Sequence, residues 1–266
     1  MFNVTFYPQT QYILCAMRRS GQHAVINWLK PILNYHYHFN DCSPLHYPTM
    51  NLNPKDKWYS ARLNTLPSLT HNSSVIINLE SKSIQICLQS IQFHSHPTTT
   101  IIPILLLRDP FNSFAGETVF PKLFRKSKSL QDQSNLILSL RNTWIDHANQ
   151  FLNPSSPFIP INYNSWFSSQ PYRQSISQKF NKTFDDSNFS TMIKYSPGHS
   201  LFQPNLPDNS QLTPFIRWQS TITNPIFIQF LSPTVFSLAK QIFPEFLYHD
   251  QIYNSWLNSP HPKLPE

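Results

Sequence analysis

The chain has 266 residues, of which 40% are hydrophobic and 14% aromatic, so it is long and apolar enough to bury the core of a folded domain and is not a disordered protein. Its formal net charge of +7 favours an anionic ligand, but lysines and arginines gather only in the short stretch 122–128, so no nucleic-acid partner is expected. The 3 Cys are scattered, the N-terminus is not leader-like and no apolar run could cross a bilayer, which predicts a cytoplasmic protein without a disulfide framework, zinc site or membrane anchor.

Strands and helices are predicted to alternate along the chain. The first strand, at residues 11–17, leads through a turn with Gly21 into a helix that Pro31 is expected to end. Further apolar runs predict strands at 74–79, 100–107 and 158–162. Helical patterns are predicted around 84–93, 136–151 and 172–180, with a last helix around 235–242.

This alternation predicts an α/β fold. We expect a single domain spanning 1–266, built as a three-layer α/β/α sandwich around a central, mainly parallel sheet. Two long segments without a clear period, 40–72 and 183–215, are expected to be irregular loops that cover the acceptor or the nucleotide, because loops of this length in a compact domain usually carry function.

The chain contains only 3 Gly, and their positions are informative because glycine lets the backbone approach a ligand closely. Gly21 lies in the first strand-to-helix turn, Gly116 lies beyond Arg108 after the third strand, and Gly198 follows a proline. The first turn lacks the second Gly and the Lys of a Walker A loop, which disfavours a metal-dependent kinase or NTPase. Backbone N–H groups at the start of the next helix, with Arg19 beside them, predict a phosphate site instead.

Four segments then resemble the motifs of sulfotransferases that use 3′-phosphoadenosine 5′-phosphosulfate (PAPS). Residues 17–24, Met-Arg-Arg-Ser-Gly-Gln-His-Ala, resemble the 5′-phosphosulfate loop of that family, and residues 105–112, Leu-Leu-Leu-Arg-Asp-Pro-Phe-Asn, resemble its 3′-phosphate motif. Residues 161–167 are similar to the strand-and-Tyr segment of bacterial members, and 198–202 with 217–218 are similar to their late nucleotide loop. The matches follow one another in the family's order.

The resemblance implies a P-loop-like sulfotransferase fold with PAPS as co-substrate, 3′-phosphoadenosine 5′-phosphate (PAP) as product and no metal. It implies that Arg19 is the catalytic cation and that Arg108 pairs with the 3′-phosphate. The other residues implied to contact the nucleotide are Arg18, Ser20, Gly21, Gln22, His23, Ala24, Gly116, Tyr163, Gly198, His199 and Ser200. The family usually has Ser at the position of Gly116, so the hydroxyl that meets the 3′-phosphate is missing, and a backbone N–H or Ser113 would have to replace it.

The acceptor needs a base. Glu80 ends the second strand on the edge where ligands bind to parallel sheets, and with Arg19 and His23 it forms the predicted catalytic set. The alternatives for the base lie in or near the first long loop: His36, His38, Asp41 and His46.

Several of these residues also have plainer interpretations. Arg18 has the character of a surface arginine as much as of a ligand. Arg108 has an alternative role in an ion pair with Asp109 or Glu117, and Glu80 has one as a carboxylate at the start of the following helix.

The predicted function is transfer of the sulfuryl group from PAPS to a hydroxyl or amine of a small-molecule acceptor, such as a guanidinium alkaloid or another natural product. The alternative is a non-catalytic protein on the same fold that binds a nucleotide or nucleic acid. Gly116 and the charge of +7 favour this alternative.

Overall fold

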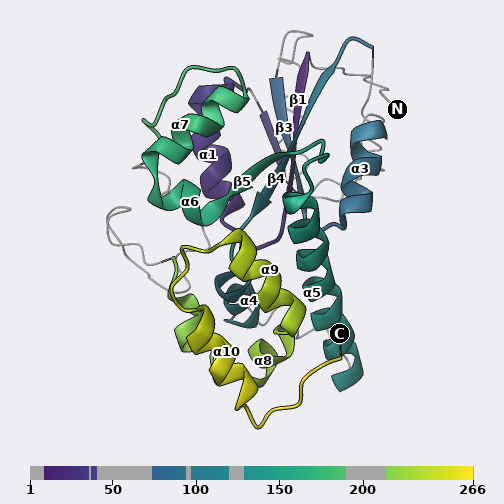
Figure 1. Ribbon diagram of the computed structural model, residues 1–266. Helices are drawn as coiled ribbons and strands as arrows, with labels where there is room; N and C mark the ends of the chain where they lie inside the picture. The colour runs from purple at the N-terminus through teal and green to yellow at the C-terminus, as the bar shows by residue number, and fades with distance from the viewer. Residues whose placement is uncertain are drawn as a thin grey trace.

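The computed structural model describes residues 9–35, 37–40, 74–93, 97–119, 129–189 and 214–265. Its centre is a parallel sheet with the strand order β2-β3-β1-β4-β5 (Figure 1). The strands are β1 (Thr10–Ala16), β2 (Tyr37–Asn40), β3 (Ser74–Glu80), β4 (Thr100–Leu107) and β5 (Ile159–Asn162). Because β1 is flanked by β3 and β4 in parallel register, the segments that follow all three strands emerge at one edge of the sheet.

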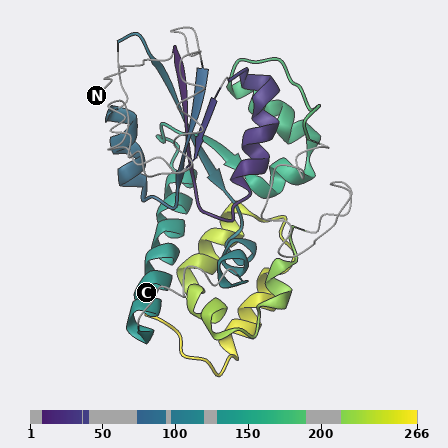
Figure 2. The same cartoon turned by 180° about the vertical axis from the view of Figure 1, so that it is seen from behind.

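Helices cover both faces of the sheet, which confirms the predicted α/β/α layers (Figures 1 and 2). Leu14 of β1 packs into the cluster of helix α1 (Gln22–Leu33), whereas its neighbours Ile13 and Cys15 pack on the opposite face against α3 (Ile84–Phe93). This alternation is the period-2 pattern of a strand buried on both sides. The first layer also holds α6 (Tyr163–Ser168) and α7 (Gln170–Lys179), and α5 (Leu130–Leu152) lies beside α3.

A third group of helices closes the carboxyl edge of the sheet (Figure 1). Its core begins with Met17 and Leu107, the residues at the ends of β1 and β4, and is rich in stacked rings such as Phe114 on Phe230, whose centroids lie 4.6 Å apart. Its helices are α4 (Pro110–Val119), α8 (Pro225–Phe230), α9 (Pro233–Ile242) and α10 (His249–Leu257), together with the lower part of α5. These helices form the floor beneath the loops that leave the strands.

Short polar residues start many of the helices, because their side-chain oxygens satisfy N–H groups that the first turn leaves without partners. Ser129, Asn162, Ser169, Asn224 and Ser232 cap α5, α6, α7, α8 and α9 in this way. In α7, α8 and α9 a proline also occupies the first turn, where no helical N–H is needed.

The prediction that Pro31 ends the first helix was wrong, since α1 continues to Leu33. Proline in a helix removes the bond that its N–H would make to the carbonyl four residues earlier, here Asn27. The side-chain Nδ2 of Asn188, from a distant segment, donates to that carbonyl at 3.0 Å. A tertiary contact therefore replaces the missing helical bond.

Two further expectations need correction. The helix at 235–242 is not the last, because α10 follows it, and the edge strand β2 was not predicted. Of the predicted loop 40–72, residue 40 belongs to β2 and 41–72 lie outside the described residues. Of the predicted loop 183–215, residues 190–213 lie outside them, and the described parts, 183–189 and 214–215, carry no regular helix or strand. In the parts of the chain that the structure describes, no helix has the length and apolarity to cross a membrane, and no cluster of metal-ligating side chains is found.

Candidate functional site

The turn between β1 and α1 has an unusual backbone. Ser20 donates its N–H to the Met17 carbonyl at 3.3 Å, which folds the chain back on itself. Arg19 and Gly21 both have positive φ angles, 64° and 84°. This left-handed conformation is free for glycine but costs other residues about 1–2 kcal/mol, so Arg19 is held in a strained state by its surroundings. Such strain is typical of functional turns.

Gly21 is required at this turn for a second reason. The ring of Tyr163, the first residue of α6, lies directly on it. A Cβ at Gly21 would come within 2.1 Å of Tyr163 Cε2. The structure therefore brings these two predicted site residues, which are far apart in the sequence, into close contact.

Helix α1 begins at this turn with free donors. Gly21 is its N-cap and has no side chain with which to cap the first N–H groups. Ala24, one of the predicted phosphate ligands, already donates its N–H to the Gly21 carbonyl at 3.0 Å. Its N–H is therefore used within the helix and is not an open donor. The N–H groups of Gln22 and His23 lie in the part of the first turn that has no helical acceptors, where the helix dipole favours an anion.

Arg108 is buried and bound by protein groups on several sides. Its Nη1 donates to the Arg19 carbonyl at 3.1 Å, and its Nη2 donates to the Pro214 carbonyl. The guanidinium lies over the ring of Tyr163, with Cζ 4.7 Å from the ring centroid. Its Nε is 3.9 Å from Asp109 Oδ2, beyond hydrogen-bond distance, so the ion pair with Asp109 that sequence reasoning left open is present but loose.

A third arginine joins this cluster through the start of α4. Asp109 Oδ1 accepts hydrogen bonds from the backbone N–H and the side-chain Nδ2 of Asn112, both at 2.8 Å. Asn112 Oδ1 in turn accepts the backbone N–H of Arg217 at 2.8 Å. Burial, and after it the positive charge of Arg108, lowers the pKa of Arg217 to about 9, with Arg19 acting in the same direction. Burial is the larger cause and the neighbouring cations add to it, so a bound polyanion would favour the charged guanidinium.

Gly116 lies in the middle of α4, and this position has two consequences. Its N–H belongs to the hydrogen-bond ladder of the helix and faces the Asn112 carbonyl. It is therefore not open to a phosphate, whereas the sequence had suggested that it could replace the missing serine hydroxyl. A Cβ at Gly116 would also lie 2.9 Å from Arg19 Cβ and 3.1 Å from Arg19 Cγ. The space above Gly116 is therefore taken by the stem of Arg19.

The next residue of α4, Glu117, faces the same turn. Its Oε1 lies 3.6 Å from Arg18 Nε, which gives Arg18 a partner that the sequence did not assign to it. Burial raises the pKa of Glu117, although Arg18 and then Arg19 oppose the shift. The buried carboxylate of Glu117 therefore faces the two arginines of the turn, Arg18 and Arg19.

Glu80 reaches the turn from the neighbouring strand. It is in register with Ala16, so the two strand ends lie side by side. Its Oε1 accepts a hydrogen bond from Gln22 Nε2 and lies 3.9 Å from His23 Nε2. Burial, and after it the charge of Arg19, lowers the pKa of His23, which favours the neutral imidazole. The predicted catalytic set is therefore brought together in one place.

Ser81 connects the end of β3 to the turn, a role that sequence reasoning missed. Its N–H donates to the Ala16 carbonyl at 2.8 Å and its Oγ accepts from Arg18 N at 3.0 Å, while its own φ is 50°. The plainer interpretation of Glu80 as a helix-starting carboxylate has less support, because Ser83 Oγ accepts an N–H from the first turn of α3. A serine directly after a strand-ending glutamate was the available signal.

Several predicted residues lie outside the described part of the chain: His36, Asp41, His46, Gly198, His199 and Ser200. Of the loop histidines, His38 is described. It lies on β2, and its ring centroid is 5.8 Å from that of His23. A site at this edge would therefore have a second imidazole beside His23.

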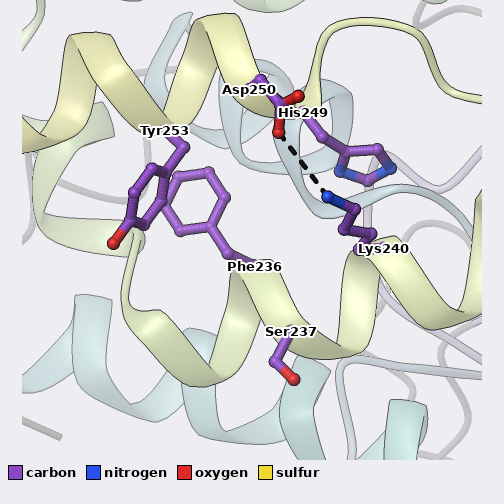
Figure 3. A pocket seen from close by; sticks show the side chains of 6 residues that line it. All are labelled: Phe236, Ser237, Lys240, His249, Asp250 and Tyr253. Atoms are coloured by element: carbon purple, nitrogen blue, oxygen red, sulfur yellow. Dashed lines mark ion pairs between the residues drawn. The ribbon is translucent and has the colours of Figure 1, made fainter.

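A pocket of about 250 Å³ lies elsewhere, between α9 and α10 (Figure 3). Lys240 and Asp250 span it with Nζ and Oδ1 3.7 Å apart, but both side chains are largely exposed, so this ion pair contributes little. Its lining is Phe236, Ser237, Lys240, His249, Asp250 and Tyr253, none of which belongs to the turn. The pocket is separate from the arginine cluster.

No protein-family model and no curated protein matches the chain. Among solved structures, mouse sulfotransferase SULT7A1 complexed with PAP matches with a TM-score of 0.41 and 11% identity, over 92% of this chain and 89% of the other. A sulfotransferase from Alicyclobacillus acidocaldarius matches with a TM-score of 0.37 and 10% identity, over 94% and 99% of the two chains. This chain is therefore similar in its path, at low identity, to two sulfotransferases.

Proposed function

We propose that this chain is a sulfotransferase that moves the sulfuryl group of PAPS to a hydroxyl or amine of a small molecule. The observation that carries the proposal is the meeting of three arginines, Arg19, Arg108 and Arg217, with the start of α1 at the carboxyl edge of the sheet. Three cations this close together favour an anion, and a phosphosulfate supplies one. A natural-product acceptor and a cytoplasmic location belong to the same proposal.

Within this proposal, the turn binds the phosphosulfate and stabilises the transition state. The open N–H groups of Gln22 and His23 would hold the 5′-phosphate. As the bond from sulfur to the acceptor forms and the bond from sulfur to the bridging oxygen breaks, negative charge grows on that oxygen and on PAP as it leaves. The guanidinium of Arg19, whose backbone is already fixed, would stabilise this charge without reorganising.

Glu80 would take the proton that the acceptor hydroxyl or amine loses. Gln22 holds Oε1 of the carboxylate by a hydrogen bond, and His23 Nε2 lies 3.9 Å from the same oxygen. The lowered pKa of His23 keeps its imidazole neutral near pH 7. A neutral His23 would orient the acceptor without adding a positive charge that competes with Arg19 for the phosphosulfate. The base and the donor site then meet at one edge of the sheet.

Isothermal titration with PAP tests the proposal first. Wild-type protein should bind PAP, Arg19→Ala should lose most of this affinity, and Lys240→Ala, a surface change on α9, should bind like wild type. Turnover of PAPS against a panel of phenols, alcohols and amines follows. Failure of the wild type to bind PAP at millimolar concentration would overturn the proposal.

The non-catalytic alternative is separated by the same experiments. Binding of PAP without turnover across the panel would favour a nucleotide-binding protein. Affinity for an oligonucleotide that falls steeply with salt, in the absence of PAP binding, would favour a nucleic-acid-binding protein, because phosphate contacts release counterions.

A further inference from the structure

Arg108 has little freedom to meet a ligand. Its side chain is completely buried, with a relative exposure of 0%. Both terminal nitrogens donate to backbone carbonyls, and the face of its guanidinium is covered by Tyr163. Because the side chain is fully buried, a phosphate could reach it only if the groups that cover it moved, whereas the bond from Nη1 fixes the carbonyl of Arg19.

Gly116 serves the same residue from the other side. The stem of Arg19 passes so close to its Cα that even a methyl group would meet Arg19 Cβ at 2.9 Å. The position at which the resembled family has a serine hydroxyl is therefore filled by the side chain of Arg19. The two positions that the resemblance assigns to the 3′-phosphate both contact Arg19.

From this we infer that Arg108 and Gly116 form a cradle that positions Arg19, and that neither recognises the 3′-phosphate. A non-glycine residue with a φ of 64° persists only when its surroundings hold it there. Arg108 binds the Arg19 carbonyl and Gly116 receives the Arg19 stem, so the cradle supplies this restraint. Arg108 and Gly116 are positioning residues, and the inference rests on the proposed function of Arg19.

The cradle and a 3′-phosphate site predict different behaviour toward two nucleotides. PAP and adenosine 5′-monophosphate (AMP) share the 5′-phosphate that the turn would bind, but AMP lacks the 3′-phosphate. A change in a 3′-phosphate ligand weakens PAP alone. A change in the cradle displaces Arg19 and weakens both nucleotides by the same factor.

The experiment is a titration of PAP and AMP into wild type, Arg108→Lys, Gly116→Ser and the matched variant Gly116→Ala, each checked for folding by thermal melting. Arg108→Lys keeps the positive charge but cannot make both carbonyl bonds and the stack. We expect it to weaken both nucleotides by about tenfold, the scale of one charge-assisted hydrogen bond, with the PAP-to-AMP ratio unchanged within about twofold. Selective loss of PAP binding would overturn the cradle.

The two hypotheses predict opposite changes in PAP affinity for Gly116→Ser. If the site merely lacks its hydroxyl, this variant gains affinity for PAP, and Gly116→Ala does not. The cradle predicts that both variants lose affinity for PAP and AMP alike, because either side chain meets the stem of Arg19. A gain for PAP in the serine variant would overturn the inference.

Hydrogen–deuterium exchange over residues 17–24 keeps the cradle testable without a ligand. The peptide should exchange faster in Arg108→Lys and Gly116→Ser than in wild type, while a peptide from α9 should not change. If wild type binds neither nucleotide but the turn still loosens in both variants, the proposed function fails and the cradle stands. Unchanged exchange of the turn would overturn the cradle whatever the nucleotides do.

Discussion

Replacing Gly21 by alanine tests the close packing on which the turn depends. The φ of 84° at this position costs an L-residue about 1–2 kcal/mol. The added methyl would also lie 2.1 Å from Tyr163 Cε2, so the ring must shift, and overpacking of a buried site costs about 1–3 kcal/mol. We expect Gly21→Ala to lower the free energy of unfolding by about 2–5 kcal/mol in total, a large part of the stability of an ordinary domain.

Urea denaturation of Gly21→Ala, Tyr163→Ala and the double variant separates the two costs. With the ring removed, only the backbone cost should remain, so Gly21→Ala in the Tyr163→Ala background should cost only about 1–2 kcal/mol. An equal cost in both backgrounds would show that the ring does not rest on the turn. A cost below about 0.5 kcal/mol in the wild-type background would refute the strained conformation as well.

Three further predictions follow from single contacts. Glu80→Gln should lower kcat with PAPS by about 100-fold or more while leaving PAP affinity near wild type, because a base acts on the acceptor; equal kcat in steady-state assays would remove Glu80 from that role. Asn188→Ala should destabilise the fold by about 1 kcal/mol in urea titrations, since the Asn27 carbonyl at Pro31 loses its donor, and Asn258→Ala is a surface control. Burial lowers the pKa of His147 to about 4 from an ordinary 6.5, so on acidification the imidazole is protonated in the unfolded chain before it is protonated in the folded protein. The free energy of unfolding should therefore fall by about 3 kcal/mol between pH 6.5 and 4 on account of this residue. This component should be absent in His147→Gln, and an identical pH profile of stability in the two proteins would contradict the assignment.

The parallel core could be predicted because its signals are local. The apolar run at 100–107 coincides with β4, and the helix at 84–93 has the predicted bounds. The edge strand β2 was missed because Tyr37–Asn40 is short and alternates polar with aromatic residues, a pattern that suits a loop as well as a strand. The end of α1 was misplaced because its continuation past Pro31 depends on Asn188, which no window around the proline contains.

The site shows the same division. The turn at residues 17–24 and Glu80 follow from strands and turns that can be recognised in the sequence, because parallel strands place their carboxyl ends at one edge. The contacts of Gly116 with Arg19 and of Glu117 with Arg18 were not predictable, since they depend on how α4 packs against the turn. In the sequence, glycine in place of serine at position 116 suggested a weakened nucleotide site. In the structure, Gly116 leaves space for the side chain of Arg19.

The two hydrogen bonds of Ser81 have a consequence for acceptor choice. They fasten the last residue of β1 and the backbone of Arg18 to the residue after Glu80. In the proposed reaction, the spacing between Glu80 and Arg19 is then set by two neighbouring strands. Acceptors of different size could be selected by changes elsewhere on the molecule while the reaction distance stays the same, which separates the evolution of specificity from that of the chemistry.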